Sequence, residues 1–520
     1  MKKKIIFIAL VCSIFCAAFT QENSVEQRVI SIYSSVHDYD MNPYTAATTS
    51  EAQLFTGLYE GLFTYDPKNL SPVKALCTDY KISRDKKRWT FTIRSDAKFS
   101  DGTVITADHV KNSWLNLLKT PYAPFASMFD SVTGAAEFRQ GKGAEEDVRI
   151  VARDKNTLVV YLNEPVSHFK KILCHHAYSV VSEKKGVYSG PFVLESYSKK
   201  NMELKKNENY WDAERVKIPG IKYTFVTEKE EKDVPFLYNN GEIDWIEYPT
   251  EIKALINKDA IKSGTQFCTM YFFFKQNNEP WNHVEFRKAL LDAVPYDKLR
   301  EGSFDAAETL VPSLPGYPSV SGYSDSDVDD AILQMNKARK MYNVPQNEKL
   351  QLVFAISDDP YWEKMANLLK KAWEPLGVEL TVQTAPYYQY NSSIETWNAD
   401  MFFYSWVGDF ADPIAFLELF RGDSSLNVAK YKNEEFDKAL SEAVLKDGAY
   451  SLYAKAEQIL LDDAEVIPVH HPLSLNVIDT EQVGGWAINA LDIHPLKYLY
   501  IKALPKVSIP NLVMLRDSRR

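Results

Sequence analysis

Short segments of alternating hydrophobic and polar residues predict strands along the chain, and segments with hydrophobic residues at helical spacing predict helices. Trp89, Phe91 and Ile93 alternate with polar residues, as in a strand with one buried face. Residues 100–102, Ser-Asp-Gly, then predict a turn. A helix is predicted after Thr106, with one apolar face formed by Val110, Trp114, Leu117 and Leu118.

The same patterns continue in the second half of the chain. Residues 401–404 are a continuous apolar run typical of a buried strand. Residues 453–463 predict a helix that leads into a strand at residues 466–469. Another helix is predicted from near Val284 to Pro295, with one face formed by Phe286, Ala289, Leu290, Ala293 and Val294. Because strand and helix patterns alternate without an internal repeat, the sequence predicts an α/β fold.

Length and charge narrow the possible classes of function. A chain of 520 residues is too long for one compact core, which predicts two or three domains. The net charge is −10, and no run of lysine and arginine is longer than three residues. This argues against a nucleic-acid partner or an anionic membrane held by charge. An acidic chain with 13% aromatic residues suits a binding cleft better.

The first 20 residues are typical of an export signal. Three lysines precede an apolar segment at about residues 5–15, and Ala17 and Ala18 precede a predicted cleavage site before Gln21. No later segment has the roughly 18 to 20 apolar residues needed to cross a bilayer. We therefore expect a periplasmic or otherwise extracytoplasmic protein. Lipid attachment at Cys16 is an alternative, although Phe15 before it is a poor match to the small residue expected there.

Cysteine and histidine positions do not predict a metal site. Cys77, Cys174 and Cys268 follow the signal, an odd number that allows at most one disulfide within the chain. Adjacent histidines occur at 175–176 and 470–471. Neighbouring side chains on a strand point to opposite faces, so we expect neither pair to bind one ion readily.

Motifs of common enzymes are not found in the sequence. It has no GxSxG elbow, no HExxH pair and no P-loop. The acidic run at residues 325–330 imitates the start of a calcium loop, but Asp330 stands where the glycine belongs and Asn336 where the closing glutamate belongs. These acids are better explained as the start of a helix. We expect no catalytic residue, no cofactor and no metal.

Six segments resemble the oligopeptide- and dipeptide-binding proteins of ABC importers, the extracytoplasmic solute-binding proteins of family 5. The most distinctive is WTFTIRSDAKFSDGTVITADHVKNSW at residues 89–114. The others, in the family's order, lie at residues 190–212, 237–245, 277–290, 452–469 and 496–502. The resemblance therefore covers nearly all of the chain after the signal.

The resemblance implies a periplasmic-binding-protein-like type II fold, three-lobed, with a hinged ligand cleft. The implied ranges are residues 24–61, 186–268 and 473–505 for a discontinuous first lobe, 62–185 for an inserted second lobe, 269–472 for a third lobe and 506–520 for a C-terminal extension. It also implies a monomer that binds an oligopeptide and delivers it to the permease subunits of an ABC transporter, with no catalysis.

Asp409, in the segment SWVGDFADP, matches the family aspartate that binds the α-ammonium group of the peptide. A cap at the start of the following helix is the alternative role for this carboxylate, and Asp412, directly before Pro413, fits that role at least as well. We therefore expect Asp409 to meet the ligand and Asp412 to cap the helix.

Other ligand contacts follow from the same resemblance. In this family the peptide lies extended and pairs with strands of the protein, and hydrated pockets take its side chains. Residues 35–37, with Val36 at the centre, match the segment that pairs with the ligand backbone. The matching side chains around the cleft are Ser405, Trp406, Phe125, Tyr387, Tyr388, Phe273 and Phe274. Packing in the core is the alternative role for the aromatic ones.

The sequence departs from the family at the other end of the peptide. Relatives that prefer short peptides hold the terminal carboxylate with basic side chains, but Phe403 and Trp362 stand at two of those positions. Selection of a peptide length by such a cation is therefore in doubt. Val407 stands opposite Cys268 where a close relative has a second cysteine, so we expect Cys268 to be unpaired.

Other functions remain open from the sequence. The same fold could bind a nickel chelate, haem, a sugar or a cell-wall (murein) peptide, although Asp409 favours a ligand with a free amine. A secreted hydrolase would show turnover of a peptide or glycan. An adhesin or sensory partner would use the scaffold for protein contacts instead.

Overall fold

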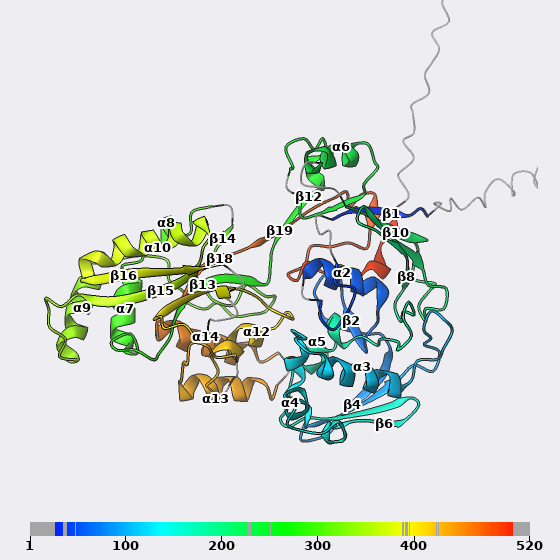
Figure 1. The fold of residues 1–520 in the computed structure, drawn as a ribbon, viewed down its shortest axis with the longest axis horizontal. Coiled ribbons are helices and arrows are strands. Elements are labelled where there is room, and N and C mark those ends of the chain that lie inside the picture. Colours follow the sequence, from blue (N-terminus) through cyan, green and yellow to red (C-terminus); the bar gives the residue numbers. More distant parts are fainter. Residues whose placement is uncertain are drawn as a thin grey trace, which may run out of the picture.

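The computed structural model describes residues 27–502, apart from 35–38, 47, 226–229, 250, 303, 387–388, 391–393, 395, 423, 425 and 447. The predicted export signal with Cys16, and the predicted extension at residues 506–520, lie outside the described residues. Three sheets of four or more strands organise the part that is described, and Figure 1 shows them as three regions of the molecule.

The largest sheet gathers strands from distant parts of the chain. We call this sheet and its helices α2 (Thr49–Leu58) and α6 (Val234–Asn239) the seven-stranded unit. Its central strand β1 is parallel to both neighbours, and the other pairs are antiparallel. In spatial order the strands are β12 (Ile261–Thr265), β19 (Leu473–Ile478), β11 (Trp245–Glu247), β1 (Ile30–Tyr33), β10 (Gly220–Thr224), β9 (Asn201–Lys206) and β8 (Phe192–Tyr197).

The four-stranded unit is an antiparallel sheet with helices on one side. Its strands, in spatial order, are β4 (Cys77–Ile82), β5 (Arg88–Ile93), β7 (Thr157–Tyr161) and β6 (Ile150–Asp154). Its helices are α3 (Ala107–Lys119), α4 (Ala135–Arg139) and α5 (Phe169–Ile172). The two-stranded pair of β2 (Phe63–Tyr65) and β3 (Pro72–Lys74) lies next to it in the chain.

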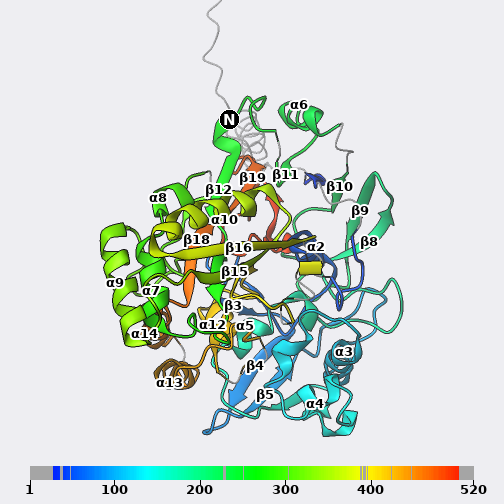
Figure 2. The ribbon, with the colours of Figure 1, turned by 60° about the vertical axis from the view of Figure 1, so that its left-hand side comes forward.

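The six-stranded unit has helices on both sides of its sheet, as Figures 1 and 2 show. Its strands, in spatial order, are β14 (Asp305–Ala306), β18 (Val466–His471), β13 (Cys268–Phe274), β17 (Met401–Val407), β15 (Leu350–Ser357) and β16 (Val378–Ala385). Its helices are α7 (Val284–Asp292), α8 (Tyr296–Leu299), α9 (Val328–Met341), α10 (Pro360–Trp373), α12 (Ile414–Leu417), α13 (Glu434–Ala443) and α14 (Tyr450–Asp462).

Two crossings of the chain connect the seven-stranded and six-stranded units. β12 leads into β13 through Gln266 and Phe267, and β18 leads into β19 through Pro472. The N–H of Gln266 donates to the carbonyl oxygen of Pro472 at 2.9 Å, so the two crossings lie side by side. Figure 1 shows β19 running between these two units.

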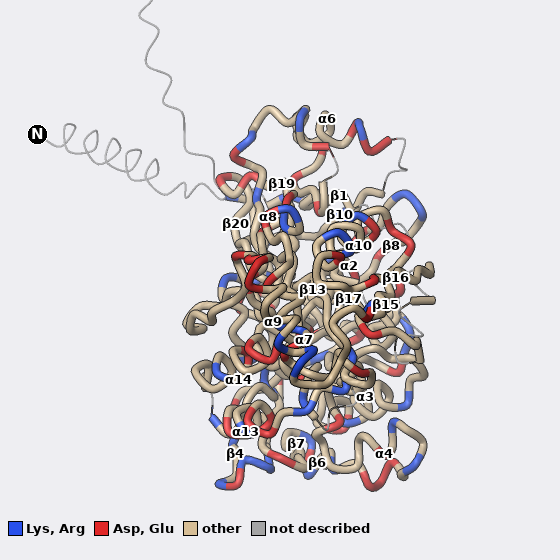
Figure 3. Tube along the Cα trace, turned by 90° about the vertical axis from the view of Figure 1, so that its left-hand side faces the viewer, with Lys and Arg blue, Asp and Glu red and all other residues tan. Residues whose placement is uncertain are grey.

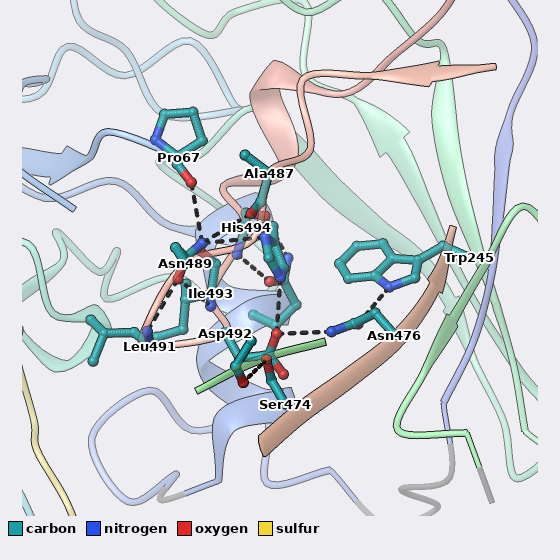
Figure 4. A network of polar contacts seen from close by, with 12 residues as sticks. Pro67, Trp245, Ser474, Asn476, Ala487, Asn489, Leu491, Asp492, Ile493 and His494 are labelled. Atoms are coloured by element: carbon teal, nitrogen blue, oxygen red, sulfur yellow. Dashed lines mark hydrogen bonds and ion pairs between the residues drawn. The ribbon is translucent and has the colours of Figure 1, made fainter. Parts of the chain in front are cut away.

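A buried polar network fixes the segment that follows β20 (Val483–Gly484) in the seven-stranded unit (Figure 4). The carboxylate of Asp492 accepts a hydrogen bond from the side-chain amide of Asn476 on β19, and the amide oxygen of Asn476 accepts one from the indole of Trp245 on β11. The side-chain amide of Asn489 donates to the carbonyl oxygen of Pro67 at 3.2 Å. This last bond ties the seven-stranded unit to the β2–β3 connection. β21 (Tyr500–Ile501) pairs with β20 beyond it.

Several elements agree with the predictions from periodicity. Trp89, Phe91 and Ile93 form the buried face of β5, and α3 begins directly after Thr106. The five predicted apolar residues of α7 are buried, although that helix ends at Asp292. The carboxylate of Asp327 accepts the N–H of Asp330 and caps α9, which confirms that the acidic run starts a helix.

The backbone at the first histidine pair differs from the strand that the expectation assumed. His175 and His176 do not lie on a strand: they begin a single 3-10 turn, and their rings lie 4.3 Å apart between centroids. His470 and His471 do lie on a strand, β18, and face different neighbours. Among the described residues, no group of three or more histidines, cysteines and acids is placed to hold a metal ion.

Charged residues and cysteines are distributed over the described part of the chain. Lysines, arginines, aspartates and glutamates are interspersed along the outer segments (Figure 3). Cys77, Cys174 and Cys268 are buried free thiols. Within residues 27–502 as described, no helix has the length and apolar character to cross a membrane.

Candidate functional site

A cavity of about 320 Å³ lies between the four-stranded and six-stranded units. Residues 127–131 and 163–172 line it on one side, and residues from the end of β17 to α13 line it on the other. The wall is mixed: apolar residues such as Met128, Ile172, Phe410 and Leu426 form about half of it, and polar or charged residues form the rest. A concave site between two units, with polar groups that converge on it, is typical of a ligand site.

Asp409 is the charged group of this cavity with no partner. It follows β17 on a short loop, residues 408–413, and it is partly buried. Among the described residues its carboxylate makes no hydrogen bond and no ion pair. Burial raises the pKa of Asp409 to about 6, because removal from water disfavours the charged form. An ionised carboxylate here would therefore gain from a cationic ligand.

Asp412 has the structural role that the sequence predicts for it. Its carboxylate accepts the N–H of Ile414, the first residue of α12, at 3.3 Å. It also pairs with the ammonium of Lys171 at 2.6 Å. Asp409 is therefore not needed as a cap of α12.

Trp406 and Ser405 lie at the end of β17, on opposite sides of that strand. Trp406 lines the cavity next to Asp409, and its indole N–H donates to the carbonyl oxygen of Ala415 at 2.8 Å. Ser405 is exposed, and its hydroxyl lies 3.8 Å from the thiol of Cys268. The structure thus brings Trp406, but not the side chain of Ser405, to the cavity wall.

The predicted phenylalanines lie away from the wall of this cavity. Phe273 and Phe274 on β13 are buried in the hydrophobic core, where Phe273 stacks on Phe402 with 5.7 Å between ring centroids. Phe125 packs against His175 at 4.2 Å. The contacts of these three phenylalanines are packing contacts within the protein. Val36, Tyr387 and Tyr388 lie outside the described residues.

Trp362 and Phe403, which the resemblance matches to basic positions of some relatives, form part of the core. Trp362 on α10 and Phe403 on β17 are 6% and 1% exposed, so neither can meet a carboxylate in solvent without rearrangement. Their rings lie 4.1 Å apart between centroids, and the ring of Tyr390 stacks on Phe403 from another direction at 4.7 Å. This region is closed by packing rather than left as an unfilled anion site.

Sequence reasoning missed His168 and Arg421 at the cavity. The His168 ring stacks on Phe410 with 5.1 Å between centroids, and burial lowers the pKa of His168 to about 4, so it is neutral at pH 7. The guanidinium of Arg421 pairs with Glu418 at 3.4 Å and with Glu164 at 3.8 Å. No motif marks these residues, because the contacts of His168 with Phe410 and of Arg421 with Glu164 join segments far apart in sequence.

The three α/β units, two of them joined by paired crossings, define the class: this is a periplasmic-binding-protein-like fold. The family model described as bacterial extracellular solute-binding proteins, family 5, middle part, matches residues 71–427, more than half of the chain. The chain belongs to this family, as the sequence segments predicted.

Relatives with known names are similar over almost their whole length. The dipeptide-binding protein DppE of Bacillus subtilis is 26% identical, over 92% of this chain and 91% of that protein. The periplasmic oligopeptide-binding protein OppA of Salmonella typhimurium is 27% identical, over 89% and 90%. An unliganded open form of the murein tripeptide-binding protein MppA matches with a TM-score of 0.76 at 24% identity, over 92% of this chain and 98% of that one.

Proposed function

We propose that this protein binds oligopeptides in the cavity between the four-stranded and six-stranded units and delivers them to the permease subunits of an ABC transporter. The observation that supports this most is the unpartnered, partly buried carboxylate of Asp409 in the cavity wall. Relatives named for dipeptides and oligopeptides favour a peptide over other amines.

In the proposed complex, Asp409 binds the α-ammonium group of the peptide and Trp406 lies beside its first residue. At a separation of about 4 Å and an effective dielectric constant of about 20, the attraction is about 4 kcal/mol before the cost of desolvation is subtracted. The peptide backbone pairs with the protein around residues 35–37, outside the described residues. Backbone pairing makes affinity depend little on the identity of the side chains.

In this proposal the protein has three lobes, with the boundaries predicted from the sequence. The crossings at residues 266–267 and 472 then act as the hinge, because closure of the lobes needs rotation only at these short connections. The protein is proposed to be an exported, extracytoplasmic monomer that alters no covalent bond of its ligand and has no nucleic-acid partner.

Small-angle scattering with and without peptide tests ligand-induced closure. A mixture of short peptides with free amines, added to saturation, should reduce the radius of gyration of the wild-type protein. The same mixture after N-acetylation serves as the matched control and should change the profile little. Equal profiles for wild-type protein with no peptide and with saturating free-amine peptide would contradict the proposal.

The affinity for a free-amine peptide should fall below pH 6. The carboxylate of Asp409 must be ionised to attract the ammonium, and its pKa in the free protein is about 6. Below this pKa, each pH unit reduces the ionised fraction of Asp409 about tenfold. Kd should therefore be about 10-fold higher at pH 5 than at pH 7. Titration calorimetry from pH 4.5 to 7.5 measures this. The D409N variant should show no such change, and a flat profile for the wild type would count against the role of Asp409.

A further inference from the structure

Lys171 joins the four-stranded unit to the loop on which Asp409 lies. It belongs to α5, which is fixed by the buried side chains of Phe169 and Ile172. Its ammonium nonetheless makes its contacts in the six-stranded unit. It donates to the carboxylate of Asp412 at 2.6 Å and to the carbonyl oxygen of Ala411 at 2.8 Å. One cation of one unit thus binds two acceptors of another.

The other end of the same loop is fixed by a crossing. The N–H of Gly408 donates to the carbonyl oxygen of Phe267 at 2.8 Å, and Phe267 lies in the connection between β12 and β13. A Cβ atom at position 408 would come within 2.4 Å of the Phe267 ring, which is closer than atoms can approach without a shift. Asp409 therefore lies between an anchor at the crossing and an anchor from the four-stranded unit.

The Lys171–Asp412 pair is the stronger of the two ion pairs that connect these units among the described residues. The two side chains are 23% and 9% exposed, so water screens them only in part. The carboxylate also holds the first N–H of α12, which restricts its position. The second pair, Arg421 with Glu164, is 3.8 Å long and its glutamate is 52% exposed. Exposed pairs of that kind contribute little, whereas short charge-assisted hydrogen bonds contribute more.

We infer that Lys171 is a positioning residue for ligand binding: its contacts with Ala411 and Asp412 hold the Asp409 loop in place and clasp the two units together beside the cavity. The inference rests on the proposed binding of a peptide ammonium by Asp409. The contacts of the clasp are made by the chain alone, so they favour the closed arrangement of the two units, to which a bound peptide then adds its own contacts. Pre-organisation of this kind reduces the cost of ordering the loop on binding.

Lys171→Met is the informative variant, because it keeps a long apolar stem and removes the charge. Lys170→Met is the matched control: the neighbouring ammonium of Lys170 contacts the hydroxyl of Tyr80 at 3.1 Å, within its own unit. Two quantities are measured for each protein after removal of any retained cargo. They are the ratio of Kd values for an N-acetylated and a free-amine peptide, and the radius of gyration of the ligand-free protein.

Loss of the clasp should weaken binding of the free-amine peptide about tenfold and should reduce the Kd ratio, because a displaced Asp409 no longer distinguishes the amine. Ligand-free K171M should also have a larger radius of gyration. Asp412→Asn should reproduce both changes, and the K171M/D412N double variant should add little to either. K170M should match the wild type.

Unchanged Kd ratio and radius of gyration in folded K171M and D412N would overturn the inference, even if the wild type distinguishes the free amine. If K171M does not fold, K171Q, which also removes the charge, and D412N provide the same comparison. Failure of the wild-type protein to bind any free-amine peptide would instead overturn the proposed function, and the radius of gyration would still show whether the clasp exists.

Discussion

N-acetylation of a good peptide ligand should raise its Kd for this protein by about 100-fold. The modification removes the positive charge that would meet the unpartnered carboxylate of Asp409, and it leaves that carboxylate desolvated with no partner. Loss of one member of a buried charge pair commonly has an effect of this size. Titration calorimetry with the two forms of one peptide measures it.

Two matched changes separate this effect from a general loss of affinity. Amidation of the peptide's C-terminus should alter Kd by less than about 3-fold, because an exposed ion pair contributes little and no fixed cation is proposed for that end. In D409N, the free-amine and N-acetylated peptides should bind with nearly equal, low affinity. Equal binding of both forms by the wild-type protein would mean that Asp409 does not bind the ammonium.

Asp409→Asn should make the ligand-free protein more stable at pH 7.5, by up to about 3 kcal/mol. The pKa of this carboxyl is about 6 in the folded protein and about 3.9 in an unfolded chain, so the folded protein binds its proton more tightly. The cost of ionising it in the fold is absent below pH 4, increases between pH 4 and 6, and is fully present above pH 6. Asparagine removes this cost.

Urea unfolding of the wild type and D409N at several pH values tests this prediction, after cargo has been removed by unfolding and refolding. The stability difference between the two proteins should be near zero at pH 4 and largest above pH 6. Asp412→Asn should show the opposite sign at pH 7.5, because Asp412 is paired with Lys171 at 2.6 Å and loses a favourable contact. A stability difference for D409N that does not change with pH would contradict the raised pKa.

Local patterns were enough to predict many elements of the fold. β5 and α7 each bury one face with a regular period, so the period alone identifies the element and its buried residues. The same rule misplaced His175 and His176, because a period of two holds only on a strand, and these residues begin a 3-10 turn.

The candidate site was only partly predictable. Asp409 was found because its segment matches a family motif, and Asp412 because a capping residue acts on its own helix. Lys171 could not be found in this way, since its partner Asp412 is 241 residues away and the contact depends on how two units pack. Phe273 was ambiguous because an aromatic residue on a central strand suits both a core and a cleft.

Native mass spectrometry of the freshly purified protein tests the central claim most directly. We expect the folded protein to carry a series of bound peptide masses. After removal of this cargo, addition of a mixed peptide pool should restore such a series, and every ligand should be released unaltered. N-acetylation of the pool should abolish the series. A protein that carries no peptide as purified and takes none from a saturating pool, or that releases cleaved products, would contradict a peptide-binding function.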